Sequence, residues 1–527
     1  MILRPIPHSH QEANAAYLAS KDAVLAFDQS KLDALPSRIE QLMNDAPYRK
    51  KLSGTLHELF PADAVATYIT LIEEILQKKG RGSVYCVGIG GIGISAVAGY
   101  LLTKGYRVMG SDLGHSTVTD RLEAKGVRVF YDHRKENIPP DCVMLIYSDA
   151  VPRSNEEIVE AQKRGIKVYA YNEYLGKISK SKRTIAVTGT HGKTTTTALA
   201  GLLLREAGQD PTIIVGAFVP QLDNSNVVVG GGPLFIVEAD EYRAHMLALK
   251  PSVIVLTNID ADHLDFYRDL NDIKVNFQRF ADALNIDGLL IKNADDEHSH
   301  TITAKKMITY GFADAADYRL TNHTVLHGEQ SFSISTGGKT LGTFSMQVPG
   351  LFNVYNATAA ITAAHHLGVS VEQIRSTLAG FKGTWRRLER IGTYHAMTVY
   401  SDYGHHPTAI RATLQALKDF YPDQRTIVVY QPHSYSRTKK LLVEFRSAFG
   451  VADQLILTEI YDAIGRGDAK EISGKQLFDE IEHSNKVFAA TAEEITSVLD
   501  KMGNPGDIVV IMGAGSIDTY ARTLADL

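Results

Sequence analysis

The chain has 527 residues, a formal net charge of -5, 44% hydrophobic residues and 22% charged residues. At roughly 150 residues per domain, this length predicts three or four domains. Acidic and basic residues are mixed along the chain, so the composition gives no indication of nucleic-acid binding.

Neither the cysteines nor the hydrophobic segments are typical of a secreted or membrane protein. Cys86 and Cys142 lie in apolar, strand-like segments and are too few for a disulfide framework or a Cys-rich zinc site. The first ten residues lack the apolar core of a signal peptide, and no apolar run of about 18 residues follows. We therefore expect buried thiols, a cytoplasmic location and no membrane insertion.

Residues 1–82 have helical spacing of apolar residues, including Ile39 with Leu42 and Ile69 with Ile72. Prolines interrupt the pattern, and a basic turn ends it. The segment has no cluster of His, Asp or Arg. We expect a helical extension that serves packing or partner binding.

From Ser83 the pattern changes to a strand, a glycine-rich turn and a helix, which predicts a Rossmann-like domain over residues 83–180. Asp112 ends the next strand about 20 residues later, where an acid that binds ribose is expected. A nicotinamide-dependent oxidoreductase and a simple packing turn are the alternatives. The residues of the turn and the first helical turn are Gly88, Gly90, Gly91, Gly93 and Ser95.

The segment from Thr184 to Thr197, T-I-A-V-T-G-T-H-G-K-T-T-T-T, begins a central domain over residues 181–380. Its glycines let backbone N–H groups approach phosphate, its lysine suits the β- and γ-phosphates, and a threonine hydroxyl suits Mg²⁺. Val187 makes the motif shorter than the common form. The predicted phosphate-binding residues are Gly189, Thr190, His191, Gly192, Lys193, Thr194 and Thr195.

Residues that can bind a metal ion follow two further strands of this domain. Glu238 ends L-F-I-V, and His263 follows V-I-V-L-T-N-I. In an open α/β sheet both strand ends lie at the carboxyl edge beside the phosphate loop. Carboxylate oxygens and a neutral imidazole are suitable ligands for Mg²⁺ bound to ATP. Asp262 and Asp265 are weaker candidates, because acids commonly cap a following helix.

Residues 301–350 favour short strands and turns, and a third α/β block covers residues 381–527. Polar motifs follow its strands and turns, where the functional loops of α/β domains gather. Each motif alone would be interpreted as a solvated or structural group. They are Arg386-Arg387, Ser401 to Pro407 with Asp402, Tyr403 and His405, and Gln431 to Thr438 with His433 and Arg437.

Taken in order, these motifs resemble the Mur ligases of peptidoglycan precursor synthesis. The resemblance covers residues 83–527 and rests on G-I-G-G-x-G-x-S, T-G-T-H-G-K-T-T-T-T, E-A-D-E, T-N-I-x-x-D-H-L-D, D-Y-G-H-H-P and Q-P-H-x-Y-S-R-T. It implies an α/β fold of three domains after the helical N-terminal extension. These are a Rossmann-like UDP-substrate domain, a central P-loop ATPase domain and a Rossmann-like C-terminal domain that brings the amino acid.

The resemblance also implies amide formation between UDP-N-acetylmuramate and L-alanine, driven by ATP and Mg²⁺ through an acyl phosphate. It implies metal binding by Thr194 with Glu238, and by His263 for a second ion. The implied catalytic residues are Lys193, Glu238, His263, Asp402 and His405. Beyond the phosphate loop, ATP would contact Asn353, Asn356 and Arg387, and the substrates would contact the glycine-rich turn, Ser95, Asp112, Ser148, Arg386, Tyr403, His433 and Arg437.

The chain departs from the family pattern at Ser401, Ser434 and Phe352, and Lys274 does not match the spacing of the carbamylated lysine of some relatives. A ligase that adds a recycled tripeptide to the same UDP-sugar is the alternative within the superfamily. A nicotinamide-dependent oxidoreductase and a non-catalytic ATP-binding regulator are alternatives outside it. Both a monomer and a homodimer are compatible with the sequence.

Overall fold

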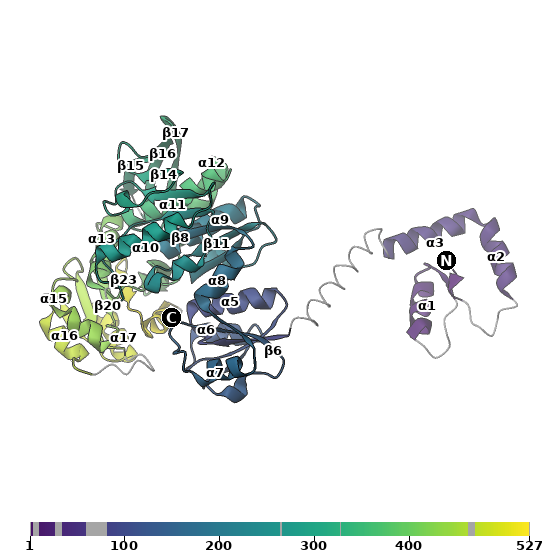
Figure 1. Cartoon of the computed structure of the whole chain (residues 1–527), viewed down its shortest axis with the longest axis horizontal. Helices are drawn as coiled ribbons and strands as arrows, with labels where there is room; N and C mark the ends of the chain where they lie inside the picture. Colours follow the sequence, from purple (N-terminus) through teal and green to yellow (C-terminus); the bar gives the residue numbers. More distant parts are fainter. Residues whose placement is uncertain are drawn as a thin grey trace. The chain divides into compact units, whose positions relative to one another are not determined.

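The computed structural model describes residues 2–3, 10–26, 34–59, 82–263, 266–326, 328–461 and 470–525. The chain divides into two compact units, Met1–Arg81 and Gly82–Leu527 (Figure 1). Within the described residues, every helix is too short or too polar to cross a membrane.

The first unit is mainly helical, which confirms the expected helical extension. Pro36 lies in the first turn of α2, where its missing N–H costs no hydrogen bond. The expected helical segment around Ile69 and Ile72 lies outside the described residues. The unit contains β1 (Ile2–Leu3), α1 (His10–Ser20), β2 (Leu25–Ala26), α2 (Leu35–Asn44) and α3 (Ala46–Leu59), and β1 pairs with β2 in parallel.

The five-stranded region, residues 83–179, is a parallel sheet in the order β5-β4-β3-β6-β7. Successive residues of β3 point to opposite faces, so Val84 packs against α5 while Tyr85 faces α7. The elements are β3 (Ser83–Val87), α5 (Ile92–Thr103), β4 (Arg107–Ser111), α6 (Thr117–Glu123), β5 (Arg128–Phe130), η2 (Lys135–Asn137), β6 (Cys142–Tyr147), α7 (Glu156–Lys163), β7 (Lys167–Ala170) and α8 (Tyr171–Ser179). Cys86 and Cys142 are buried free thiols, as expected.

The ten-stranded region, residues 183–379, has the order β10-β9-β11-β8-β12-β13-β14-β15-β16-β17. Six neighbouring strands from β9 to β14 are parallel, and β15 to β17 form an antiparallel meander, as residues 301–350 predict.

Its strands are β8 (Arg183–Thr188), β9 (Thr212–Val219), β10 (Ser225–Val228), β11 (Leu234–Glu238), β12 (Val253–Leu256), β13 (Leu289–Asn293), β14 (Met307–Gly311), β15 (Tyr318–Leu326), β16 (Glu329–Thr336) and β17 (Lys339–Met346). Its helices are α9 (Lys193–Glu206), η3 (Pro220–Leu222), η4 (Tyr242–Ala248), α10 (Leu270–Asp282), η5 (Ser299–Thr301), α11 (Leu351–His366) and α12 (Val371–Ala379).

The six-stranded region, residues 389–525, has the order β18-β19-β23-β20-β21-β22, with only β18 antiparallel to its neighbour. Its elements are β18 (Glu389–Tyr394), β19 (Met397–Asp402), α13 (Pro407–Phe420), β20 (Thr426–Tyr430), α14 (Tyr435–Lys440), α15 (Leu442–Phe445), β21 (Gln454–Leu457), α16 (Gly474–Glu480), β22 (Lys486–Phe488), α17 (Ala492–Met502), β23 (Ile508–Met512) and α18 (Ile517–Ala525).

One hydrophobic core joins the five-stranded and ten-stranded regions. Helices α5 and α8 lie between the two sheets (Figure 1). Side chains such as Val97 and Leu175 share a cluster with Phe235 and Phe277. Asn226 on β10 donates hydrogen bonds to Ile92 O at 2.8 Å and to the Ser95 hydroxyl at 2.9 Å. The carboxyl ends of β3 and β8 are therefore held in a fixed relation.

Candidate active site

The loop between β8 and α9 has the backbone of a phosphate-binding turn. Gly189 and Gly192 have φ angles of 132° and 82°, which L-residues with a side chain rarely adopt. A Cβ atom at Gly192 would lie 2.1 Å from Asn356 Oδ1, so the close approach of α11 also requires glycine here. The N-terminus of α9 then presents its unpaired N–H groups, where an anion is stabilised.

Strand β12 ends beside this loop and fixes its shape. The amide N–H of His191 donates to Asn258 Oδ1 at 2.9 Å, and the Thr257 hydroxyl donates to His191 O at 2.6 Å. The Thr190 hydroxyl accepts a hydrogen bond from the amide N–H of Asp260 at 2.9 Å. The phosphate loop is therefore preorganised by a neighbouring strand end, as expected for the carboxyl edge of the sheet.

Lys193 lies at the centre of a group of buried charges. Its Nζ is 2.7 Å from Glu241 Oε2 and donates to Gly189 O at 2.8 Å. Burial opposes the charge of Lys193, but Glu241 and Asp240 outweigh that effect and raise its pKa. Lys193 is therefore a permanent cation at the phosphate loop.

Glu238, at the end of β11, faces the first turn of α9. Its Oε1 accepts a hydrogen bond from the Thr194 hydroxyl at 3.0 Å, and its Oε2 accepts one from Gly216 N at 2.7 Å. Burial raises the pKa of Glu238, and the charge of Lys193 only partly offsets this. The Thr194 hydroxyl and the buried Glu238 carboxylate bring oxygen atoms together, and the charge on the carboxylate is only partly compensated by Lys193. Such oxygen ligands fit a Mg²⁺ ion.

His263 lies on the other side of Glu241, with 3.6 Å between its Nε2 and Glu241 Oε1. The neighbouring Glu241 carboxylate raises the pKa of His263, and the charge of Asp262 acts in the same direction. The Asp262 carboxylate accepts a hydrogen bond from the backbone N–H of His263 at 2.7 Å. Asp265 lies outside the described residues.

The first turn of α11 carries the two asparagines that the sequence predicts for ATP. Asn356 Nδ2 donates to Asn353 Oδ1 at 3.1 Å, and Asn353 Nδ2 donates to Pro349 O at 2.7 Å. Both residues are buried. Phe352, which departs from the family pattern, is exposed on the same turn.

The glycine-rich turn after β3 meets the ends of β4 and β6. Gly90 N donates to Asp112 Oδ2 at 2.7 Å, and a Cβ at Gly88 would lie 2.9 Å from Ser148 Cβ. Gly91 is the N-cap of α5, and Gly93 packs against the Tyr171 ring. The structure thus brings Asp112, Ser148 and the turn together at one sheet edge.

Ser95 is placed differently from the rest of this predicted group. Its hydroxyl is buried, donates to Ile92 O at 2.8 Å and accepts from Asn226. Its observed role is to join α5 to β10, and substrate contact by Ser95 remains a prediction.

Arg386 and Arg387 precede β18, and their guanidinium groups have different surroundings. Arg386 is buried and donates to the carbonyl groups of Gly513 and Gly515 after β23. The guanidinium carbons of both residues lie 5.0 Å from the centre of the Tyr403 ring. Burial raises the pKa of Glu238, and the charge of Arg387 is one of the groups that partly offset this effect. The hydrogen bonds of Arg386 therefore brace its own region.

Asp402 and His405 are held in a polar turn after β19. Asp402 accepts hydrogen bonds from Leu388 N at 2.8 Å and Gly404 N at 2.7 Å, and burial raises its pKa. His405 packs edge-to-face on Tyr403, and its Nδ1 is 3.1 Å from Tyr403 O. Burial, followed by the charge of Arg437, lowers the pKa of His405 to about 3. His405 is therefore a neutral imidazole at physiological pH.

The loop before α14 brings the remaining predicted residues to the same place. The ring of His433 stacks on Tyr461 with 5.7 Å between centroids and lies 6.5 Å from the ring of His405. Ser434, where the chain departs from the family pattern, caps α14 by accepting a hydrogen bond from Arg437 N. Arg437 lies in the first turn of α14, and its charge contributes to the lowered pKa of His405.

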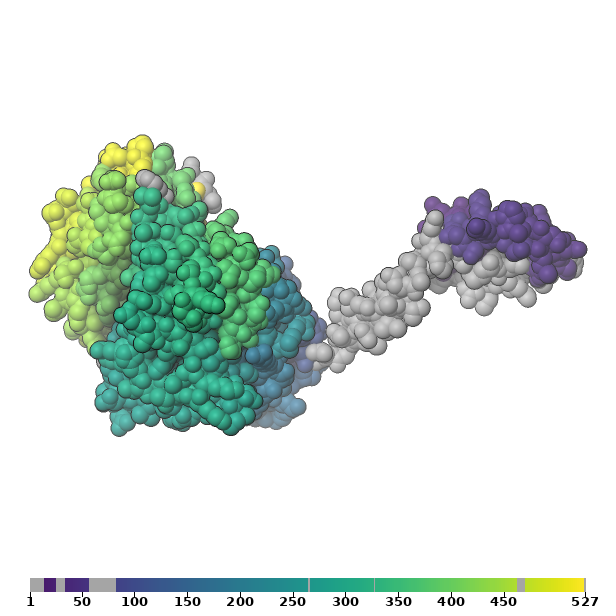
Figure 2. All heavy atoms as spheres, turned by 90° about the horizontal axis from the view of Figure 1, so that it is seen from above, coloured from purple at the N-terminus to yellow at the C-terminus, as the bar shows by residue number. Residues whose placement is uncertain are grey.

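All three sheet regions meet at the only tryptophan of the sequence. The Trp385 ring lies 5.0 Å from the Phe218 ring, and the Arg121 guanidinium lies 4.1 Å from that same Phe218 ring. Trp385 Nε1 donates to Asp518 Oδ2 at 3.0 Å. Figure 2 shows the green and yellow-green atoms of the C-terminal part against the teal atoms of the ten-stranded region. These contacts therefore join the three sheet regions around Trp385.

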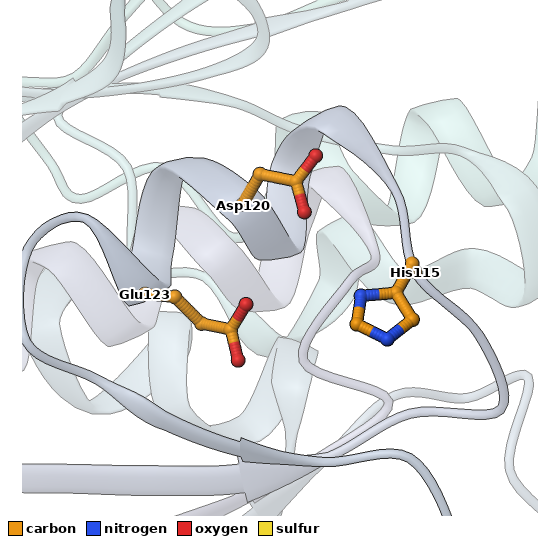
Figure 3. A group of neighbouring side chains, drawn as sticks. All are labelled: His115, Asp120 and Glu123. Carbon is orange, nitrogen blue, oxygen red and sulfur yellow. The ribbon is translucent and has the colours of Figure 1, made fainter.

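A group of possible metal ligands also lies outside the predicted site. His115, Asp120 and Glu123 bring one ligand atom each within 4.8 Å of one another, on α6 and the loop before it (Figure 3). All three are exposed. The Tyr131 hydroxyl donates to Glu123 at 3.0 Å, and its ring stacks on His115. Packing on Tyr131 accounts for the positions of His115 and Glu123.

Sequence reasoning missed three residues of the site, Glu241, His245 and Asn258. Glu241 is the last acid of E-A-D-E and Asn258 ends T-N, so their position after buried strands was an available signal. His245 bridges Asp149 and Asp240 at 3.2 Å and 3.3 Å. No local pattern marks His245, because its partners come from two different sheets.

Comparisons with known proteins agree with this organisation. Three family models match the chain: "Mur ligase family, catalytic domain" over residues 83–183, "Mur ligase middle domain" over 187–364, and "Mur ligase, glutamate ligase domain" over 386–515. A UDP-N-acetylmuramate--L-alanine ligase of Aquifex aeolicus (strain VF5) is 40% identical over 439 residues, which cover 83% of this chain and 95% of the relative.

The protein of the same name from Salinibacter ruber is also 40% identical, over 84% of this chain and 94% of its own length. A crystal structure of UDP-N-acetylmuramate-alanine ligase from Thermotoga maritima is 28% identical and has a TM-score of 0.73. It aligns with 85% of this chain and 99% of its own. The expected three-part α/β architecture is thereby confirmed.

Proposed function

The chain belongs to the Mur ligase family, and from that premise we propose that it is an ATP-dependent ligase that joins L-alanine to UDP-N-acetylmuramate. The observation that carries the proposal is the phosphate loop, where Lys193 pairs with Glu241 and Thr194 donates a hydrogen bond to Glu238. The alignments with two relatives cover nearly the full length of those relatives, and both are named for this activity.

The reaction proceeds in two steps. The lactyl carboxylate of the UDP-sugar attacks the γ-phosphate of ATP, which forms an acyl phosphate and releases ADP. The amino group of L-alanine then attacks the acyl carbon, loses a proton and displaces phosphate. A carboxylate is a poor electrophile, so phosphorylation supplies the leaving group, and the enzyme acts by positioning and by charge stabilisation.

The residues of the phosphate loop stabilise the transferring phosphoryl group. Lys193 and the N-terminus of α9 bind the phosphates, with Asn353, Asn356 and Arg387 completing the ATP site. Thr194 and Glu238 are the donors that would hold Mg²⁺, and His263 would hold a second ion. Mg²⁺ in such a site neutralises phosphate charge.

The other substrate contacts follow from the two remaining sheet edges. Gly88, Gly90, Gly91 and Gly93, with Asp112 and Ser148, bind the nucleotide of the UDP-sugar. Tyr403, His405, His433 and Arg437 bind the amino acid, and Asp402 holds the turn that carries them. We propose the domain bounds 1–82, 83–180, 181–380 and 381–527 on the same grounds.

Phosphate release tests the proposal directly. The full chain is incubated with ATP, Mg²⁺ and UDP-N-acetylmuramate, and L-alanine, glycine, L-serine or the L-Ala-γ-D-Glu-diaminopimelate tripeptide is added. A small apolar pocket discriminates single groups by about 1–3 kcal/mol, so glycine and L-serine should react more slowly than L-alanine. Preference for the tripeptide would identify a recycling ligase instead, and no phosphate release with any acceptor would contradict a ligase.

Arg437 provides the corresponding test of the amino-acid site. A guanidinium fork matches a carboxylate better than an ammonium does, so Arg437→Lys should raise KM for L-alanine while KM for ATP stays unchanged. Lys439→Arg, an exchange on the same helix at an exposed position, is the control. Unchanged L-alanine kinetics in Arg437→Lys would remove Arg437 from the site.

A further inference from the structure

A pocket of about 350 Å³ lies between the five-stranded and ten-stranded regions. Loops after β6 and β7 form one side, and the η4 segment forms the other. The lining residues that bear on its chemistry are Asp149, Arg153, Glu173, Arg243 and His245.

One wall of the pocket is connected to strand ends of both sheets. His245 forms part of its wall and pairs with Asp149 after β6 and with Asp240 after β11. The neighbouring Tyr171 packs against Gly93 at the start of α5, and burial together with the charge of Glu238 raises its pKa. A sugar nucleotide with its diphosphate at α5 would therefore place its sugar in this pocket, on the way to the γ-phosphate.

The acidic residues and the arginines of the pocket differ in their partners. Asp149 pairs with His245, and Glu173 accepts a hydrogen bond from Ala170 N at 2.9 Å. By contrast, neither Arg153 nor Arg243 forms an ion pair with a carboxylate in the part of the chain that the structure describes. The acids have internal partners while both guanidinium groups are available, so the pocket is suited to an anion.

The backbone holds Arg243 in an uncommon conformation. Arg243 and Ala244 have φ angles of 51° and 56°, in the left-handed region that residues other than glycine rarely adopt. The Arg243 guanidinium lies over the Tyr242 ring at 5.3 Å from its centre. Two strained residues in succession beside the E-A-D-E segment are typical of a functional site.

We propose that Arg243, assisted by Arg153, binds the lactyl carboxylate of the sugar nucleotide and so selects UDP-N-acetylmuramate over UDP-sugars without that group. This inference rests on the proposed function and names the residue that gives it substrate specificity. Outside its diphosphate, the sugar nucleotide has only this one charge, and a guanidinium group recognises a carboxylate through two parallel hydrogen bonds.

Calorimetric binding without ATP tests the proposal. The full chain is titrated with UDP, UDP-N-acetylglucosamine and UDP-N-acetylmuramate, in wild type, Arg243→Ala, Arg243→Lys and Arg153→Ala. The control is Arg319→Ala, an arginine of the ten-stranded region that pairs with Asp314 on the surface. Arg243→Ala should raise Kd for UDP-N-acetylmuramate about 10- to 100-fold and change Kd for the other two ligands less than twofold.

Arg243→Lys should give an intermediate loss, Arg153→Ala a smaller loss with the same selectivity, and Arg319→Ala none. Equal losses for all three ligands, or no loss in either Arg243 variant, would overturn the proposal. Wild type that binds UDP-N-acetylmuramate no better than UDP-N-acetylglucosamine would also overturn it. Wild type that binds UDP and UDP-N-acetylglucosamine but excludes UDP-N-acetylmuramate would instead contradict the proposed function.

Discussion

Lys193 and Glu241 form a buried pair whose charges depend on each other. Their side chains are 14% and 3% exposed, so loss of the cation leaves an unpaired carboxylate in a poorly solvated place. Glu238 nearby depends on the same cation. Lys193, the residue proposed to bind phosphate, therefore also stabilises the carboxylates around it.

Lys193→Ala should leave a folded protein with about a thousandfold less ligase activity, because several kcal/mol of transition-state stabilisation are lost. It should also lower the free energy of unfolding by about 3–5 kcal/mol, and a second change, Glu241→Gln, should recover part of that loss. Steady-state phosphate release and urea unfolding measure the two effects. Lys306→Ala, which removes an exposed partner of Asp287, is the control. Near-normal turnover in a folded Lys193→Ala protein would contradict the assignment of the loop.

His405 predicts a pH dependence of stability. Its pKa falls from 6.5 to about 3 in the folded protein, so between these values the unfolded chain binds a proton that the folded chain does not. This contribution to stability is complete above pH 6.5 and is lost as the pH falls toward 3, with a slope of up to about 1.4 kcal/mol per pH unit.

The measurement is the difference in unfolding free energy between wild type and His405→Gln from pH 7 to pH 4. His133 and His263 have raised pKa values, so they act in the opposite direction. Both are present in wild type and in the variant, so the difference cancels their contributions and isolates that of His405. The variant should lose less stability on acidification, and the exposed His115→Gln variant should follow wild type. Parallel curves for wild type and His405→Gln would show that His405 is accessible to protons.

At the scale of elements, the phosphate loop is a joint between β8, α9 and α11. Its shape depends on two contacts from outside the loop, Asn258 from the end of β12 and Asn356 from α11. The shape of the loop therefore depends on two elements that are distant in sequence, β12 and α11.

Gly192→Ala should weaken ATP binding at least tenfold and destabilise the protein, because the new Cβ would overlap Asn356 at a positive φ. Gly208→Ala is a matched control. Gly208 follows the same helix with a φ of 75°, but a Cβ there meets nothing within 4 Å. The control should show only the backbone strain of about 1–2 kcal/mol and should keep its affinity for ATP. Equal ATP affinity in the two variants would argue against a tight loop.

At the scale of the whole molecule, residues 82–527 carry every residue that we assign to substrates. The division of contacts after Arg81 separates the helical extension from them. Within the larger unit, the core shared by the five-stranded and ten-stranded regions makes these two parts structurally dependent on each other.

A chain that begins at Gly82 should fold and should bind ATP and UDP-N-acetylmuramate with unchanged affinity. Circular dichroism and calorimetric titration measure the two properties. A soluble, folded truncated chain that fails to bind the UDP-sugar would show that the extension takes part in the substrate site.

The sequence alone determined the class of the fold and the phosphate loop. Strand, glycine-rich turn and helix follow from local residue chemistry, and the positions of Lys193, Thr194 and Glu238 after buried strands suffice to predict that they meet. The same holds for the meander of residues 301–350, because alternation and turn residues are local signals.

Only the tertiary structure decided which partners the polar residues of the motifs meet. Ser95 and Arg386 belong to motifs, yet their hydrogen bonds go to Asn226 and to carbonyl groups after β23. Arg243 belongs to no predicted site, yet its guanidinium group borders a pocket. The physical reason is that burial and pairing of a charge depend on partners far away in sequence, and these are fixed only when the sheets pack together.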